Sequence, residues 1–148
     1  MDALQVLANV RKLDILQTAD DTINENSEVF ADLIATQMAH GVRSDGSDIL
    51  PSYKPLTIEM KQGRSGLAGV TDRVTLFDQG NFYRGLFVKA IGLDIEYGSR
   101  DWKLEKLDKK YSTRRGSIVK PTEESKEEII TGFLQPQFYE KAHAITGL

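Results

Sequence analysis

The stretch VTLFDQGNFYRGLFVK, from Val74 to Lys89, decides the fold prediction. It contains an apolar segment, an Asp-Gln-Gly-Asn turn at 78–81 and an aromatic-rich segment. Glycine and asparagine favour turns, whereas aromatic and β-branched residues favour strands. We therefore predict a short strand, or an extension that precedes a helix, at 74–77 and a longer strand at 82–91.

The strand at 82–91 is expected to form a hairpin with the segment that follows it. Gly92 is placed to turn the chain, after which Leu93, Ile95 and Tyr97 alternate with acidic residues. A period of two is typical of a half-buried strand. The centre of the chain is thus predicted to be a small antiparallel sheet.

Residues before the sheet show helical spacing. Apolar residues with charges between them predict a helix from 1 to about 17. Thr22 and Glu25 have the spacing of a capping box, which predicts a second helix that ends near Ala39, with Gly41 placed to form a left-handed cap. One long bent helix is the alternative. The buried stripe of the second helix is expected to consist of Val29, Phe30, Leu33, Ile34 and Met38.

The segment between these helices and the sheet is predicted to be largely irregular. Turn-forming residues fill 44–48, and Pro51 and Pro55 are predicted to exclude a helix. Residues 54–61 show an apolar–polar alternation that is typical of a strand. The alternating residues are Leu56, Ile58 and Met60. Residues 62–69 are rich in glycine and are expected to form a flexible, surface-exposed loop.

Two helices are expected after the sheet. Apolar spacing places the first at 100–111, packed on the sheet. The second opens at 121–124, because carboxylates are favoured in the first turn of a helix. Pro136 is predicted to kink or interrupt it, which leaves 137–145 as a second segment or a continuation. The apolar side of the first helix consists of Leu104, Leu107 and Tyr111, and that of the second of Ile129, Ile130, Phe133 and Leu134.

These patterns predict an α+β fold in one domain that spans residues 1–148. It would have a helical N-terminal part at about 2–40, a sheet-containing core at about 54–111 and a C-terminal helical part at about 121–146. The small antiparallel sheet is expected to pack against both helical parts. Composition agrees, because 40% hydrophobic and 28% charged residues are sufficient for one ordinary core.

Composition also argues against several classes of protein. The chain has no cysteine, which excludes disulfides, thiol nucleophiles and thiolate metal sites. No stretch approaches the roughly 18 apolar residues that a membrane span needs, and the chain opens without a signal-peptide pattern. A net charge of −3 argues against a dedicated binder of polyanions. We expect synthesis in the cytoplasm and no membrane partner.

The remaining polar motifs predict no catalytic residue, metal site or cofactor. The two histidines lie at predicted helix ends. Residues 45–48 lack the later ligands of a calcium loop, and residues 63–69 lack the Gly-Lys-Ser/Thr ending of a phosphate loop. We therefore predict that the chain is not an enzyme. A pocket that brought Asp78, His40 and Arg84 together would favour an enzyme instead.

Charged and aromatic side chains form the candidate interface. The residues concerned are Trp102, Lys109, Lys110, Arg114, Arg115, Glu123, Glu124, Glu127 and Glu128. The basic ones, together with Lys120, are interpreted first as a solvated face, next as a subunit contact and last as a DNA contact. Trp102 lies off the apolar side of its predicted helix and is expected to anchor an interface, where tryptophan is enriched.

Several short motifs follow one another in a recognisable order. They are Gln37 to Val42 at a helix end, Asp45-Gly46 and Tyr53 in a loop, Thr71 to Phe77, Asp78 to Gly85, a hairpin, and Lys109-Lys110-Tyr111. Over roughly residues 25 to 135 this order resembles small neck or tail-completion proteins of tailed phages. The most specific element is a structural turn motif made of Asp78, Gly80, Asn81, Phe82, Tyr83 and Arg84.

The resemblance implies a structural virion protein, a head–tail connector made in the host bacterial cytoplasm. Copies of an α+β subunit would form a ring between portal and tail, contacting one another and portal, neck or tail proteins, with non-specific proximity to DNA in the channel. Ring contacts are head-to-tail, so we expect the acidic helix at 123–128 of one copy to meet the basic segment at 109–115 of the next. The loop at 62–69 and the termini are expected to become ordered on docking.

The alternative is a non-virion protein-binding module, an adaptor or inhibitor of a phage or mobile element. Such a module would use the exposed glycine-rich loop and Trp102 to bind a cellular protein. It would be a monomer or a dimer and would not form a ring.

Overall fold

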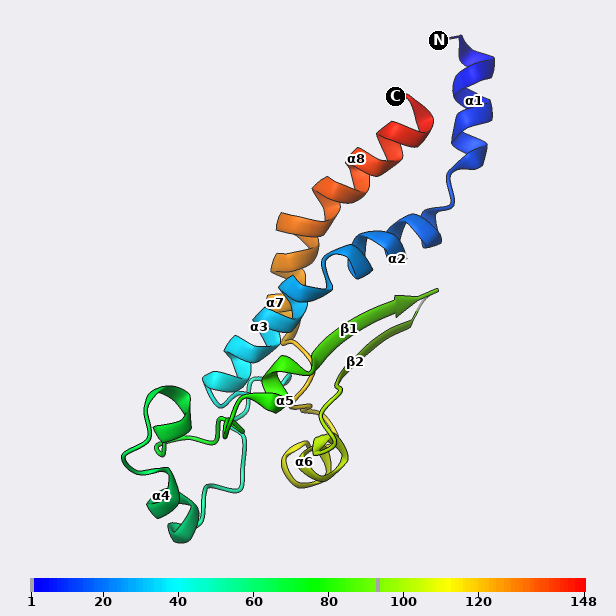
Figure 1. The fold of residues 1–148 in the computed structure, drawn as a ribbon. Coiled ribbons are helices and arrows are strands. Elements are labelled where there is room, and N and C mark those ends of the chain that lie inside the picture. Colours follow the sequence, from blue (N-terminus) through cyan, green and yellow to red (C-terminus); the bar gives the residue numbers. More distant parts are fainter. Residues whose placement is uncertain (1, 93) are drawn as a thin grey trace.

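The computed structural model describes residues 2–92 and 94–148, so Met1 and Leu93 lie outside the described residues. Figure 1 shows the arrangement of the helices and strands. In chain order the elements are α1 (Ala3–Lys12), α2 (Ile15–Glu25), α3 (Ser27–Ala39), α4 (Pro55–Lys61), the 3₁₀ turn η1 (Gly66–Gly69), α5 (Asn81–Arg84), β1 (Leu86–Ile91), β2 (Asp94–Ser99), α6 (Leu104–Tyr111), α7 (Glu123–Ile129), the π-helical turn η2 (Ile130–Leu134) and α8 (Gln135–Thr146).

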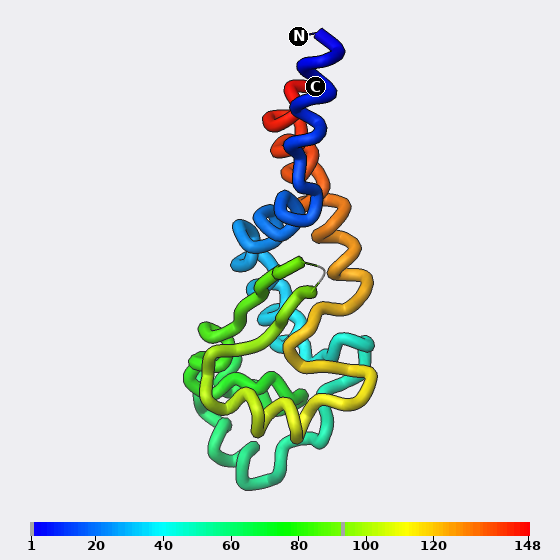
Figure 2. The backbone as a smooth tube through the Cα atoms, turned by 90° about the vertical axis from the view of Figure 1, so that its right-hand side faces the viewer, coloured from blue at the N-terminus to red at the C-terminus, as the bar shows by residue number. Residues whose placement is uncertain are grey.

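The molecule has a body and a projecting arm (Figures 1 and 2). We define the arm as α1 and α8, which contact each other and carry the two ends of the chain at the tip. The body contains the other elements, with the β1–β2 hairpin and helices α2 and α3 at its centre. Helices from the two ends of the sequence therefore meet each other in the arm.

The sheet is the antiparallel hairpin of β1 and β2. Leu86 lies opposite Ser99 at its base, and Ile91 lies opposite Asp94 near its tip. Helices α2 and α3 pack against β1, and the C-terminal helical part reaches the same core through Ile129. The predicted α+β class, with a small antiparallel sheet packed against helices from both ends of the chain, is confirmed.

The core lies where α3, the hairpin and the segment before α5 meet. Its best-covered aromatic side chains are Phe30 and Phe82. Burying a side chain of this size contributes roughly 1.5–3 kcal/mol, so this cluster dominates the stability of the body. The buried cluster consists of Phe30, Ile34, Met38, Ile49, Val74, Phe82, Leu86, Val88, Tyr111, Ile118, Val119, Ile129 and Leu134.

The prediction of one helix over 1–17 is wrong. The chain leaves the helical conformation after Lys12, and α2 begins at Ile15. Asp14 is in an extended conformation, and its side chain accepts a hydrogen bond from the backbone N–H of Gln17 at 2.9 Å. Aspartate is a favoured N-cap, so its local preference outweighs the continuing apolar period.

The predicted start of the second helix is also wrong, whereas its end is confirmed. Thr22 lies inside α2 and donates its hydroxyl to the carbonyl of Thr18 at 2.7 Å. Asn26 separates α2 from α3, so the alternative of one long bent helix does not hold either. Helix α3 ends at Ala39, and Gly41 adopts the expected left-handed conformation, with φ +73°. The predicted stripe of α3 is buried or packed against the core.

The segment at 54–61 is a helix and not a strand. Pro55 occupies the first turn of α4, where proline is tolerated because the N–H it lacks has no acceptor in the helix. Leu56 and Met60 are exposed, so their alternation does not mark a buried face. A pattern of three apolar residues in a short window is compatible with both structures.

The long strand predicted at 82–91 starts later than expected. After Gly80, with φ +86°, the chain forms one helical turn, α5, and β1 begins only at Leu86. The segment at 74–77 precedes this helical turn as irregular backbone: none of its residues belongs to a strand, and Leu76, with φ +58°, is in the left-handed region, so neither the predicted strand nor the predicted extension forms. The hairpin turn at Gly92 is confirmed, but Ile95 is exposed because α2 and α3 contact β1 and leave the tip of β2 uncovered.

The helices after the sheet follow the prediction more closely. Helix α6 places its apolar side against the core, and Leu104 approaches Gly98 of β2. Helix α7 starts after Thr122, whose hydroxyl oxygen accepts a hydrogen bond from the N–H of Ser125 at 3.2 Å. The helix continues past Pro136 after the π-helical turn η2. Because of that turn, the predicted apolar face is only half buried: Ile129 and Leu134 are covered, whereas Ile130 and Phe133 are exposed.

Candidate functional site

The turn motif at 78–84 connects parts of the body. Phe82 is only 2% exposed and lies in the core. The Tyr83 hydroxyl donates to the carbonyl of Thr75 at 2.6 Å, and its ring packs edge-on against Phe77 with the centroids 5.1 Å apart. Burial raises the pKa of the Tyr83 hydroxyl, so it stays protonated as a donor. The motif positions the start of β1 relative to the preceding segment.

Two arginines hold the polar side of the motif. Arg84 donates to the side chain of Asn81 and to the carbonyl of Gln79, which closes the turn on itself. Arg64 pairs with Asp78 at 2.6 Å and lowers the pKa of that carboxyl by hydrogen bonding. The glycine-rich loop at 62–69 is therefore attached to the motif at its surface. Its ordering on docking remains a prediction.

Tyr53 and two buried cations also hold the body together, and no sequence pattern predicts their roles. The Tyr53 hydroxyl accepts from the N–H groups of Thr75 and Leu76, both at 3.1 Å. Lys61 is buried, donates to the carbonyl of Phe77 at 2.8 Å and lies over the Tyr53 ring. Arg43 is buried as well and donates mainly to backbone carbonyls. No local pattern distinguishes these cations from exposed ones, because Lys61 donates to a carbonyl 16 residues away and Arg43 to one 68 residues away.

The basic and acidic candidates lie on neighbouring surfaces of α6, the following loop and α7. Arg115 and Glu123 line one cavity of about 350 Å³ together with Asp45, Tyr97 and Lys126. Glu123 pairs with Lys126 at 3.2 Å. Opposite charges therefore already lie around one cavity within one chain. The other charged candidates are exposed and make no ion pair within the described part of the chain: Lys109, Lys110, Arg114, Glu124, Glu127 and Glu128.

Trp102 lies just before α6 and is 83% exposed. Burial of an indole ring is favourable because its apolar surface is large, and an exposed ring lacks this contribution. Tryptophan is also enriched at the centres of interfaces. Its position is compatible with the predicted role as an anchor. That role remains a prediction.

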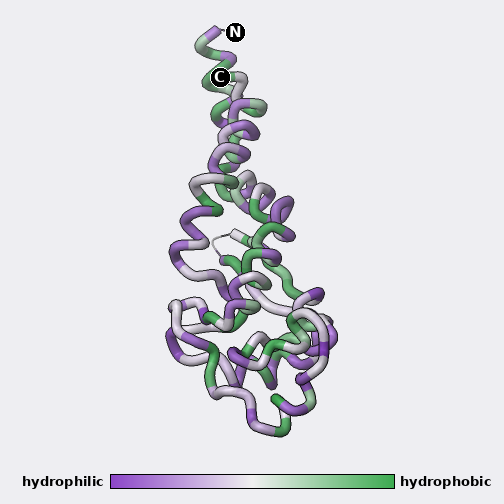
Figure 3. Tube along the Cα trace, turned by 90° about the vertical axis from the view of Figure 1, so that its left-hand side faces the viewer, coloured by the Kyte–Doolittle hydropathy of each residue, from purple (hydrophilic) through white to green (hydrophobic). Residues whose placement is uncertain are grey.

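The arm exposes an apolar stripe of its own. Helix α1 has no buried residue, and Leu4, Leu7 and Val10 are 79%, 47% and 42% exposed. Figure 3 shows hydrophobic positions recurring along the arm. Helix α1 contacts α8 on its other side, where the Asn9 side chain donates to the carbonyl of Thr146 at 3.4 Å. The apolar side chains whose spacing predicted this helix are thus exposed in the described part of the chain.

The residues that would favour an enzyme are not brought together. His40, Asp78 and Arg84 line three different cavities, of about 330, 310 and 770 Å³. Among residues 2–92 and 94–148, no group of histidines and carboxylates could hold a metal ion. The turn at 45–48 has the geometry of a plain turn, since the Asp45 carboxylate accepts from the N–H of Ser47 at 3.0 Å.

No helix in the described part of the chain is both long and apolar enough to cross a membrane. Comparisons with models of protein families, with curated proteins and with solved structures found no match.

Proposed function

We propose that this chain is a structural virion protein of a tailed phage, a neck, head–tail joining or tail-completion subunit that assembles into a ring between portal and tail. The observation that carries the proposal is the uncovered apolar stripe of the arm. A ring subunit needs surfaces that stay exposed in the free chain and become buried between copies. The motif order supports the tailed-phage context, and Trp102 supports a role in binding proteins.

The arm is suited to contact between subunits. An isolated helix of ten residues is marginal in water, so α1 depends on packing for its stability. Each leucine or valine that becomes fully buried contributes roughly 1.5–3 kcal/mol. A neighbour that covers Leu4, Leu7 and Val10 would therefore stabilise α1 and the assembly together.

The charged surfaces supply a second, weaker contact. Lys109, Lys110 and Arg114 of one copy would meet Glu124, Glu127 and Glu128 of the next. Exposed ion pairs contribute little to affinity but increase the rate and the specificity of association. Arg115 and Glu123 are expected to contribute least, because they already line one cavity within the chain.

The test measures the native mass of the purified protein by light scattering after gel filtration, with and without a candidate portal or tail protein. We expect a ring-sized complex with the partner. The variant Leu4→Gln/Leu7→Gln/Val10→Gln should abolish it, because glutamine preserves helix propensity and removes the apolar stripe. The control Gln5→Ala/Lys12→Gln changes exposed residues of the same helix that lie away from the stripe, and it should assemble normally.

Trp102 favours the non-virion protein-binding module as the second candidate, because an adaptor or inhibitor needs an anchor and no ring. A stable monomer or dimer that ignores virion proteins would support this candidate over the ring subunit. In that case Trp102→Ala should weaken binding to the cellular partner, whereas the arm variant should leave it unchanged.

A further inference from the structure

The outer edge of β1, the edge away from β2, is divided into a closed half and an open half. Antiparallel strands direct the N–H and C=O groups of alternate residues to opposite edges. The N–H of Arg100 donates to the carbonyl of Gly85, which places Phe87 and Lys89 among the residues that bond to β2. Leu86, Val88 and Ala90 consequently direct their backbone groups outward.

Helix α2 closes the half nearer the hairpin tip. The Asn24 side chain accepts from the N–H of Ala90 at 2.8 Å and donates to its carbonyl at 3.0 Å. Asp20 accepts from the N–H of Gly92 at 2.7 Å. The Asn24 amide thus gives Ala90 the two hydrogen bonds that a neighbouring strand would give it.

The other half of the edge has no such partner. Within residues 2–92 and 94–148, the outward N–H and C=O groups of Leu86 and Val88 make no hydrogen bond. Both residues are nearly buried, and an unpaired backbone group away from bulk water costs free energy comparable to a lost hydrogen bond. Two donors and two acceptors in strand geometry therefore remain available for one more strand.

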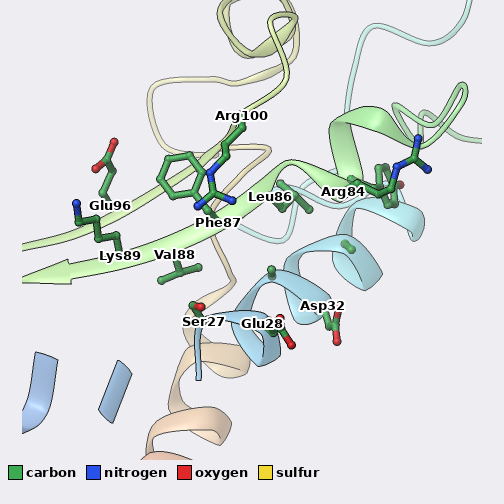
Figure 4. A pocket seen from close by; sticks show the side chains of 13 residues that line it. Ser27, Glu28, Asp32, Arg84, Leu86, Phe87, Val88, Lys89, Glu96 and Arg100 are labelled. Carbon is green, nitrogen blue, oxygen red and sulfur yellow. The ribbon is translucent and has the colours of Figure 1, made fainter. Parts of the chain in front are cut away.

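A groove runs along this open half (Figure 4). It has a volume of about 770 Å³ and lies between β1 and α3. Small side chains of α3 form its floor: Ser27, Ala31 and Ala35. Because these side chains are short, a strand beside β1 has room for its own side chains above α3.

The α3 wall of the groove is acidic. Glu28 and Asp32 lie one helical turn apart, and their carboxylates make no hydrogen bond or ion pair with another described residue. Arg84 at one end is occupied by Asn81 and Gln79, and Arg100 lies over the Phe87 ring at 5.3 Å. The charge left unpaired at the α3 wall is therefore negative.

We propose that this groove binds an extended, lysine- or arginine-bearing segment of another protein as a third strand beside β1. Residues of the segment that lie opposite Leu86 and Val88 exchange backbone hydrogen bonds with them and direct their side chains toward α3. A lysine at such a position lays its methylene chain over Ala31 and Ala35 and brings its ammonium group to Glu28 and Asp32. Backbone bonds give affinity, and the acidic wall selects the basic side chain.

The first test uses a synthetic probe, acetyl-(Thr-Lys)₄-amide, with the full-length protein. Threonine favours strands, and every lysine lies on one face of the extended peptide. Amide exchange followed by NMR should slow at Leu86 and Val88 on addition of the peptide. It should stay unchanged at Phe87 and Lys89, whose N–H groups already bond to β2. If the amide exchange rates of Leu86 and Val88 do not fall on addition of the peptide, the proposal is wrong.

N-methylated forms of the probe test the backbone pairing. The lysine N–H groups face β1 in the proposed complex, so N-methylation of the lysines should weaken binding at least tenfold, measured by calorimetry. N-methylation of the threonines alters the far edge of the peptide and should leave the affinity nearly unchanged. Equal losses for the two peptides would contradict pairing along β1.

Variants of the protein test the groove itself. Glu28→Lys/Asp32→Lys should weaken binding at least tenfold, and Ala31→Arg should block the floor. Glu105→Lys on α6 and Thr36→Arg on α3 are matched controls outside the groove and should bind normally. Unaltered binding to the groove variants would overturn the proposal.

A second copy of the chain is the other conceivable occupant. If exchange at Leu86 and Val88 is slowed without peptide and in step with a rise in native mass, the edge pairs with a second copy and the peptide proposal is wrong. The inference does not rest on the ring proposal. The ring is tested by native mass with virion proteins, and the groove by exchange at two amides, so either can fail alone.

Discussion

The body and the arm use amphipathic helices in different ways. In the body, α3 buries Phe30, Ile34 and Met38 almost completely. In the arm, α1 carries apolar residues at similar spacing and buries none of them. The spacing of apolar residues therefore shows which of them share a face, and it does not show whether the same chain covers that face. Most of the buried apolar side chains that stabilise the fold lie in the body, whereas the arm exposes an apolar surface that another protein chain can cover.

The largest effect on stability is expected for a core residue of the body. Phe82→Ala should lower the free energy of unfolding by about 3–5 kcal/mol, because it removes a buried ring and leaves a cavity. Urea denaturation measures the loss. Phe133→Ala, in the exposed part of η2, is the control and should cost much less. Equal losses would show that burial of the Phe82 ring is not what makes the substitution costly.

The next effect is expected at the closed half of the β1 edge. Asn24→Ala leaves the N–H and C=O of Ala90 without their partner, and should cost roughly 1–3 kcal/mol. Denaturation gives the cost, and faster amide exchange at Ala90 locates it. Gln17→Ala changes an exposed residue of the same helix and should be nearly neutral.

A smaller effect is expected at the start of α7 in the body. Thr122→Ala removes the N-cap of α7 and should cost about 1 kcal/mol. Thr122→Ser keeps the hydroxyl and should restore most of the loss in thermal unfolding. A serine variant as unstable as the alanine variant would argue against capping as the cause.

The free energy of unfolding should fall at alkaline pH, whereas around neutral pH the tyrosines should make it independent of pH. Burial raises the pKa values of Tyr83 and Tyr97 above the unfolded value of 10.0, with Glu123 adding to the effect on Tyr97. The contribution of a raised pKa is fully present below pH 10 and is lost as the pH rises above it. Unfolding measured across the alkaline range should show this decline, and Tyr83→Phe should make it shallower. A decline of the same steepness in Tyr83→Phe would exclude Tyr83 as a cause.

The smallest effect on stability is expected in the arm. Leu4→Gln/Leu7→Gln/Val10→Gln should change the free energy of unfolding by no more than about 0.5 kcal/mol, because these side chains are already exposed. Urea denaturation of the free subunit makes the comparison with the body direct. A loss as large as that of Phe82→Ala would mean that the stripe is covered within the free chain.

The sequence predicts the fold well where a helix is long or its ends have strong local signals. Helix α3 ends at Ala39 before the left-handed Gly41 as expected, and α7 begins after Thr122 as expected. Prediction fails for the short helices α4 and α5, because a few residues show too little of a period to separate helix from strand. It also fails at Asp14, where one capping side chain outweighs an apolar pattern that runs past it.

The candidate surfaces divide in the same way. Trp102, which lies just before α6, is exposed, in agreement with its predicted place off the apolar side of the helix expected at 100–111. The division of the β1 edge has no local signal in the sequence, because its closed half depends on Asn24, which lies 66 residues before Ala90. Side chains from distant elements determine which backbone N–H and C=O groups are hydrogen-bonded, and no pattern within one segment predicts these contacts.

The π-helical turn η2 sets the direction of the arm. The N–H of Gln135 donates to the carbonyl of Ile130, five residues earlier, so the turn holds one residue more than an α-helix would. Each residue of a helix advances it by about 100° around its axis, so the face that α8 offers to α1 depends on this single insertion. Deletion of Gly132, which borders open space, would rotate α8 by about that angle. The number of residues in η2 thus determines the rotation of α8 about the helix axis relative to α7.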